Sequence, residues 1–167
     1  MSEGLLCECR MPLVWREATP DAAERQSMMR EAALLLAAIN QMEGGHETEP
    51  GADNRRLDRL EAKLDLALHL LARALDPSAP GMIHRVRLGA EAVEWEAPQP
   101  PEEGTTLILE LRPSEALPLT LKLPAMARAP EAGMARAALT DLSETLNDAL
   151  VQFVFRRHRQ AIRARAG

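Results

Sequence analysis

The stretch from Arg55 to Leu75 (RRLDRLEAKLDLALHLLARAL) constrains the fold of this chain more than any other. Its apolar residues recur at three- and four-residue steps with no glycine or proline between them, which predicts a helix with one apolar stripe. That stripe consists of Leu57, Leu60, Leu64, Leu68, Leu71 and Leu75. Leu66 and Leu70 fall on the far side of the same helix, so a single neighbour cannot cover both faces. We call residues 55–75 the leucine helix and expect it to have several packing partners.

Two interpretations of the leucine helix are open from its own residues. It is either buried in the core of its own protomer, or it packs against copies of itself. Three heptads, typical of a coiled coil, can be read from Leu57, Leu64 and Leu71 with Leu60, Ala67 and Ala74. The alternative through Leu68 and Leu75 follows the 3.6-residue period of a straight helix. The position of the helix in the chain, described below, favours self-association.

Composition limits the classes of partner. The chain has 167 residues, enough for one domain over residues 1–167, and a formal charge of −5. Aromatic residues make up only 2% and tyrosine is absent, so few side chains are available to stack on bases, and we expect no nucleic-acid partner. The N-terminus lacks a basic segment followed by a long apolar run, and no stretch reaches membrane-spanning length. These features predict a cytoplasmic protein without a membrane span.

Cysteine and histidine do not predict a metal centre. Cys7 and Cys9 are two residues apart, so they share one side of a strand, but two thiolates cannot complete a tetrahedral zinc site. The four histidines are scattered without ligand spacing. In a cytoplasmic protein we therefore expect two reduced, partly buried thiols.

Before the leucine helix the sequence predicts a strand and a second helix. Residues 5–15 are apolar enough for a strand, with Pro12 near an end or an edge. A helix is expected over 19–43, with Thr19 as N-cap and an apolar face that includes Met28, Leu35 and Ile39. A short polar segment then leads to the leucine helix, so residues 19–43 and 54–76 read as a helical hairpin inserted after the first strand.

After residue 82 the pattern changes to strands. Residues 83–95 are rich in strand formers, residues 105–111 alternate, and residues 117–123 alternate between leucine and polar or proline residues. We expect the main strands over 82–139, and a further extended pair around residues 131–133. A final helix over 141–164, capped by Asp141 or Ser143, ends in a run of arginines.

The expected class is therefore α+β, a small antiparallel β-barrel with a C-terminal helix and a projecting helical hairpin. We find no glycine-rich phosphate loop, no catalytic triad arrangement and no carboxylate cluster with ligand spacing. We therefore predict that the protein is not an enzyme. An enzyme of unknown type would require a buried polar constellation that the sequence does not reveal.

Several segments resemble a PilZ domain, in particular its atypical, tetramer-forming branch. The resemblance rests on residues 85–111 (RVRLGAEAVEWEAPQPPEEGTTLILEL), 117–125 and 140–163, on the first strand with MPLVW at 11–15, and on the ending FVFRRHRQAIRAR. It implies a six-stranded barrel with a C-terminal helix, and an inserted leucine helix that builds a parallel four-stranded coiled coil between subunits. A homotetramer is expected to use Leu57, Leu60, Leu64, Ala67, Leu68, Leu71, Leu75, Met28, Leu35 and Ile39 as its interface.

The resemblance also brings a ligand, cyclic di-GMP, which typical PilZ domains bind through Arg-x-x-x-Arg and an (Asp/Asn)-x-Ser-x-x-Gly turn. Arginines grip phosphates bidentately, and the short polar turn lets the backbone approach the ligand. Here Arg87 stands in place of the acid and Gly89 in place of the serine, and the turn ends in Glu91-Ala92 without the glycine. The pair Arg55 and Arg59 matches the first motif as a string but opens the leucine helix. No ligand residue is carried over, and no cofactor is expected.

Two functions follow from these observations. The first is a non-catalytic signalling adaptor of the PilZ type, self-assembled through the leucine helix and acting on an unidentified protein partner in processes such as motility, pilus function or virulence. The alternative is a cyclic di-GMP receptor with a non-standard arginine surface, formed by Arg87, Arg156, Arg157 and Arg159. For the arginines near the C-terminus, a solvated last turn is the simpler interpretation, because cations suit the end of a helix.

Overall fold

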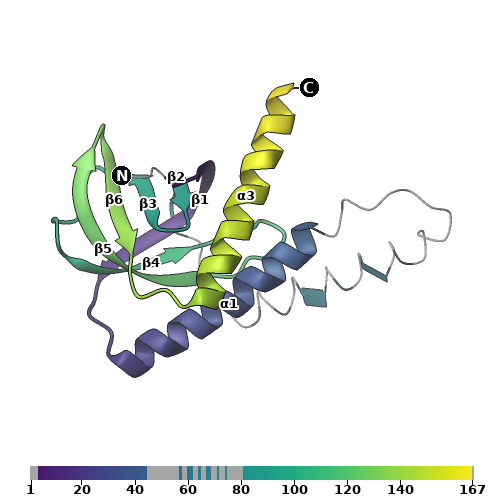
Figure 1. Cartoon of the computed structure of the whole chain (residues 1–167), viewed down its shortest axis with the longest axis horizontal. Coiled ribbons are helices and arrows are strands. Elements are labelled where there is room, and N and C mark those ends of the chain that lie inside the picture. Colours follow the sequence, from purple (N-terminus) through teal and green to yellow (C-terminus); the bar gives the residue numbers. More distant parts are fainter. Residues whose placement is uncertain are drawn as a thin grey trace.

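The computed structural model describes residues 4–44 and 81–166, together with eight residues of the leucine helix: Leu57, Leu60, Glu61, Leu64, Ala67, Leu68, Leu71 and Ala74. Six antiparallel strands close into a barrel in the order β1-β2-β3-β6-β5-β4, and two helices lie at one side of it (Figure 1). The strands are β1 (Leu6–Glu17), β2 (Ile83–Gly89), β3 (Ala92–Glu96), β4 (Thr106–Leu111), β5 (Leu121–Glu131) and β6 (Met134–Leu139). The helices are α1 (Ala22–Gly44) and α3 (Glu144–Ala166). The predicted six-stranded barrel with a C-terminal helix is confirmed.

The first strand closes the barrel because it pairs with two neighbours. Residues 6–12 of β1 pair with β2, and residues 13–17 pair with β4. Pro12 lies at the change of partner, where its carbonyl accepts a hydrogen bond from the Arg112 N–H at 3.1 Å. A strand tolerates proline at such a junction because the regular ladder is interrupted there.

Alternating side chains fill the interior of the barrel. Trp95 and Leu109 have no exposed surface, and the same holds for a set of further leucines: Leu88, Leu107, Leu111, Leu121 and Leu123. The alternation that predicted the strands places one face of each strand in this core. The indole Nε1 of Trp95 is buried without a hydrogen-bond partner, so the ring contributes as an apolar group.

Helix α1 starts with a reciprocal cap. The Glu24 N–H donates to Oδ1 of Asp21 at 2.8 Å, and the Asp21 N–H donates to Oε2 of Glu24 at 3.1 Å. This is the capping-box arrangement, in which two backbone donors at the helix start are satisfied by side chains. The N-cap is therefore Asp21, and the expectation for Thr19 was wrong by two residues, because only Asp21 has an acid three residues further on.

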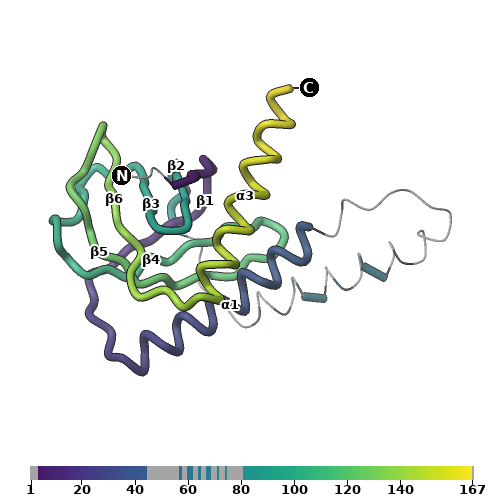
Figure 2. The backbone as a smooth tube through the Cα atoms, in the orientation of Figure 1, coloured from purple at the N-terminus to yellow at the C-terminus, as the bar shows by residue number. Residues whose placement is uncertain are grey.

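Helix α3 packs against α1 and the barrel through its first three turns. The Leu146 N–H donates to Oγ of Ser143 at 3.2 Å, which selects Ser143 over Asp141 as the cap. Leu150 and Phe153 are fully buried, as are Leu36 and Ile39 of α1. From residue 159 to 166 every residue of α3 is exposed. This end of the helix extends beyond the barrel and α1 (Figure 2).

One strand boundary differs from expectation, and one expected pair of strands is observed. Residues 117–119 are not in a strand, and β5 begins only at Leu121, although Leu117 is buried like the leucines that follow it. The weakly alternating segment around residue 131 forms a tight hairpin between β5 and β6. Ala132 and Gly133 have positive φ angles of 51° and 78°, the combination that a two-residue turn needs to match the strand twist.

Candidate functional site

The leucine helix presents an apolar face to solvent. All eight of its described residues are helical. Leu57, Leu60, Leu64 and Leu71 are 56%, 55%, 58% and 54% exposed. These four residues, which we call the leucine face, follow the three- and four-residue spacing of one helical side. Contiguous exposed apolar surfaces of this kind are typical of interaction sites.

Other residues expected at the subunit interface lie inside the protomer. Ile39 is fully buried in the core, and Leu35 and Leu68 are partly buried and pack against it. The expectation that Ile39 is available to a second chain is corrected, because its side chain is part of the protomer core and has no exposed surface. Met28 is partly exposed, and Ala67 is exposed beside the leucine face. Leu75 lies outside the described residues.

The turn between β2 and β3 holds Gly89 and Glu91, which the sequence comparison sets against the nucleotide-binding turn of typical PilZ domains. A Cβ placed on Gly89 would lie 2.7 Å from the Leu6 side chain and 3.3 Å from the Leu5 carbonyl oxygen. A side chain here would make the end of the Leu6 side chain move and the Leu5 carbonyl shift by a few tenths of an ångström, so glycine eases the close approach of β2 to the start of β1. Glu91 adds a carboxylate to the same turn, which opposes the binding of a phosphate.

Arg87 is held in a row of ion pairs across the barrel surface. Its guanidinium contacts Glu94 at 3.2 Å and Glu8 at 3.8 Å. Glu8 also pairs with Arg85 in a two-fold hydrogen bond at 3.0 Å, and this bond lowers the pKa of the Glu8 carboxyl below its ordinary value. Arg136 continues the row by pairing with Glu94 at 3.3 Å. Each arginine in the row thus has a carboxylate beside it.

Arg156 and Arg157 are occupied by a shared acid. Glu43, near the end of α1, accepts a hydrogen bond from Arg156 at 2.7 Å and one from Arg157 at 3.1 Å. Arg156 also donates to the Asn40 carbonyl at 3.0 Å, and Arg157 donates to that of Pro113 at 2.9 Å. The cluster ties α1, α3 and the loop after β4 together, which is a structural role for these two arginines.

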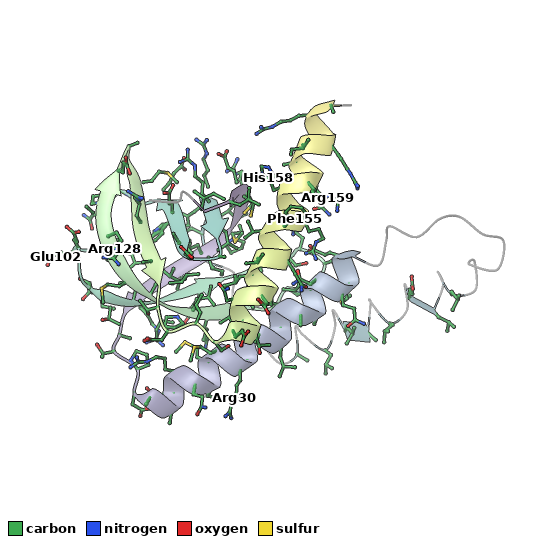
Figure 3. The ribbon with its side chains drawn as sticks, viewed as in Figure 1. Arg30, Glu102, Arg128, Phe155, His158 and Arg159 are labelled. Carbon is green, nitrogen blue, oxygen red and sulfur yellow. The ribbon has the colours of Figure 1, made fainter. Side chains whose placement is uncertain are left out.

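The remaining arginine of the predicted surface, Arg159, is exposed and lies 5.9 Å from the centre of the Phe155 ring. Phe155, His158 and Arg159 lie on the C-terminal half of α3 (Figure 3). The structure therefore brings Arg156 and Arg157 together around Glu43, while Arg87 has its partners on β1 and β3. Nucleotide contact by these four arginines stays a prediction.

The two cysteines lie side by side on β1. Cys7 is buried and Cys9 partly buried, and both thiols are free. A hydrogen bond with Cys9 lowers the pKa of Cys7, and the same contact, with burial, raises the pKa of Cys9. In the described part of the chain no three histidine, cysteine or acidic side chains are grouped as metal ligands. In the same part, no helix has the length and apolar character to cross a bilayer.

Sequence reasoning missed two features of the helices, the partners of Glu43 and an exposed apolar side of α3. Glu43 was not singled out, because nothing local indicates that an acid at the end of α1 meets two arginines more than a hundred residues later. The outer side of α3, with Val151, Phe155 and Ile162 exposed by 47%, 53% and 54%, was also missed. Its four- and seven-residue spacing was a visible signal beside the buried stripe.

Comparison with known proteins decides the family. The model of the family described as atypical PilZ domain, cyclic di-GMP receptor, matches residues 34–166. The chain belongs to the atypical PilZ domain family. Among curated proteins no match was found.

A solved structure of another PilZ protein is similar to this PilZ domain over nearly its full length. The similar protein is a pathogenic protein from Xanthomonas campestris, a tetrameric PilZ domain self-assembled via an unusual helical bundle. It is 30% identical with a TM-score of 0.73, and the match covers 97% of this chain and 92% of that one.

Proposed function

We propose that this PilZ protein is a non-catalytic, cytoplasmic signalling adaptor that self-assembles into a homotetramer through the leucine face. It would act through protein contacts in cyclic di-GMP-linked processes such as motility, pilus function or virulence. The observation that carries the proposal is the leucine face itself, four leucines that are each more than half exposed in the protomer.

The similar tetrameric protein supports the same assembly. Its self-assembly uses a helical bundle, and the leucine face supplies the apolar surface that such a bundle requires. In a bundle of identical chains each leucine meets its equivalents around the symmetry axis, so one apolar face serves all four subunits. The parallel orientation of the four helices belongs to this proposal.

The adaptor role is supported by the chemistry of the β2–β3 turn. Cyclic di-GMP carries two phosphates, and its recognition needs cations that are available for bidentate contact. Arg87 is instead paired with Glu8 and Glu94, and Glu91 adds a negative charge to the β2–β3 turn. Binding a dianion here would require breaking ion pairs and approaching an acid.

The alternative function is a cyclic di-GMP receptor, and the description of the matched family favours it. In that case the ligand would use a non-standard surface that includes Arg159, the most exposed of the predicted arginines. Arg156 and Arg157 would have to exchange Glu43 for a phosphate, because both already bind that carboxylate.

Two measurements on the full chain test the proposal. Multi-angle light scattering should give the mass of a tetramer over a wide concentration range, and a persistent monomer would refute the assembly. Calorimetric titration with cyclic di-GMP should show no saturable binding. Saturable binding that is lost in Arg159→Ala but kept in Arg30→Ala, an exposed control on α1, would establish the receptor function instead.

A further inference from the structure

An apolar groove runs between the barrel and α3, away from the leucine face. It has a volume of about 640 Å³. Leu5 and Leu6 form one wall, Ala90 of the β2–β3 turn lies at its end, and Val151, Val154 and Phe155 of α3 form the other wall. We call it the α3 groove. Its size and apolar lining are typical of a binding site.

The apolar surface continues beyond the groove along α3. Val151, Phe155 and Ile162 are spaced by four and seven residues, so they lie on one side of the helix. All three are about half exposed. At 1.5 Å per residue this stripe is about 16 Å long, or three turns of helix.

The C-terminal part of α3, which carries the apolar stripe, is rich in positive charge. Residues 149–166 of α3 contain five arginines and no acidic residue. Arg156 and Arg157 are bound to Glu43, while Arg159 and Arg165 are exposed. The side of the stripe near the end of α3 is therefore positive.

The opposite side of the groove is net negative, because three carboxylates and one arginine line it. Arg136 pairs there with both Glu94 and Glu131, and Glu91 contributes one carboxylate. A bound partner would therefore place its acidic side chains toward α3, where they can pair with the exposed arginines, and away from the carboxylates on the other side of the groove.

We propose that the α3 groove is the docking site for an amphipathic helix of a protein partner whose apolar side is flanked by carboxylates. This inference rests on the proposed adaptor function and names the surface and the chemistry of its partner. The partner's apolar side chains would enter the groove beside Val151 and Phe155. Its carboxylates would pair with Arg159 and Arg165, which fixes the direction in which it lies.

The shape of the surface favours a helix over a membrane or a small molecule. A stripe with four- and seven-residue spacing matches the apolar side of a second helix laid along the first. A small ligand would fill the groove and leave Ile162 exposed. A flat anionic membrane would not enter a concave surface that also carries Glu91 and Glu131. In a tetramer four such sites would act together, which raises the apparent affinity for a clustered partner.

Site-specific photocrosslinking in the native host tests this inference. The full chain carries p-benzoylphenylalanine at position 151 in the groove or, as a matched probe elsewhere, at position 34, where Leu34 is 73% exposed on α1. Crosslinked peptides are sequenced, and the captured segment is synthesised and titrated into the tetramer. Ile162→Glu is the test variant, because its side chain is exposed and the barrel does not depend on it.

The expected result is capture at position 151 of a helical segment with apolar residues at three- and four-residue steps and flanking acids. Its synthetic peptide should bind about tenfold more weakly to Ile162→Glu, and a version with lysine in place of the acids should not bind. Capture of only lipid, only a second copy of this chain, or a segment unaffected by Ile162→Glu would overturn the inference. If position 34 captures a partner and position 151 does not, the adaptor function survives and this docking site does not. If neither position captures a partner, both fail.

Discussion

Replacing Leu64 by aspartate tests the leucine face most severely. Full burial of a leucine side chain is worth about 1.5–3 kcal/mol. The four leucines of the face are each a little more than half exposed in the protomer, so covering them contributes about 1–1.5 kcal/mol each, or about 4–6 kcal/mol per chain. Leu64→Asp removes one such contribution and adds a buried, unpaired carboxylate that costs several kcal/mol more in every subunit. We expect the tetramer to dissociate.

The protomer itself should survive this change. Leu64 is 58% exposed in one chain, so the substitution costs the folded protomer only about 0.5–1 kcal/mol, mostly in helix propensity. Light scattering should report a monomer, and circular dichroism should retain the barrel and helix signals. Ile162→Asp, with a similar exposed fraction of 54% on α3, is the matched control and should remain tetrameric.

Two results would refute the reasoning. Complete unfolding of Leu64→Asp by circular dichroism would place the leucine face in the protomer core. A tetramer that persists in Leu64→Asp would show that assembly uses another surface.

Three further predictions concern the protomer. Glu43→Ala leaves two arginines of α3 without their shared carboxylate and should destabilise the fold by about 2–3 kcal/mol, seen as a lower thermal midpoint than in the exposed control Glu102→Ala. Gly89→Ala places a methyl group 2.7 Å from the movable end of the Leu6 side chain and 3.3 Å from the Leu5 carbonyl oxygen, so it should cost about 1 kcal/mol in a denaturant titration; an unchanged midpoint would show that the turn relaxes. Because Arg85 lowers the pKa of Glu8 in the folded state, this pair contributes stability above the ordinary carboxyl value of 4.5 and loses it as pH falls through the lowered value. In Arg85→Met the pKa of Glu8, followed by NMR, should rise, and no change would exclude the hydrogen bond as the cause.

The barrel and α3 could be predicted from sequence because their signals are local. In β5, for example, the buried Leu121 and Leu123 alternate with the exposed Lys122, and that alternation is visible in the sequence itself. The buried stripe of α3 through Leu146, Leu150 and Phe153 has the three- and four-residue spacing of a helix. The β5–β6 hairpin was harder, because its alanine-rich strands have low intrinsic preference and depend on pairing with their neighbours.

The assignment of apolar residues to particular neighbours could not be predicted. Leu68 belongs to the same stripe as Leu64, yet it packs against the protomer core while Leu64 faces solvent. Ile39 lies on the expected face of α1, but that face covers the barrel. Periodicity predicts which residues share a side of a helix, but the packing partner of that side is set by the tertiary structure.

The same limit applies to the arginines. Arg156 and Arg157 form a basic pair in the sequence, and only the fold brings Glu43 beside them. Arg87 gains Glu8 from the distant strand β1, whereas Glu94 comes from β3, the next strand of its own hairpin. Charges that appear available for a ligand in the sequence are thus occupied in the folded chain.

Sedimentation equilibrium of the full-length chain over a hundredfold range of concentration tests the central claim most directly. Self-assembly through the leucine face predicts a single species of about 74 kDa, four times the 18.4 kDa of one chain. A mass of 18.4 kDa at every concentration would contradict the account.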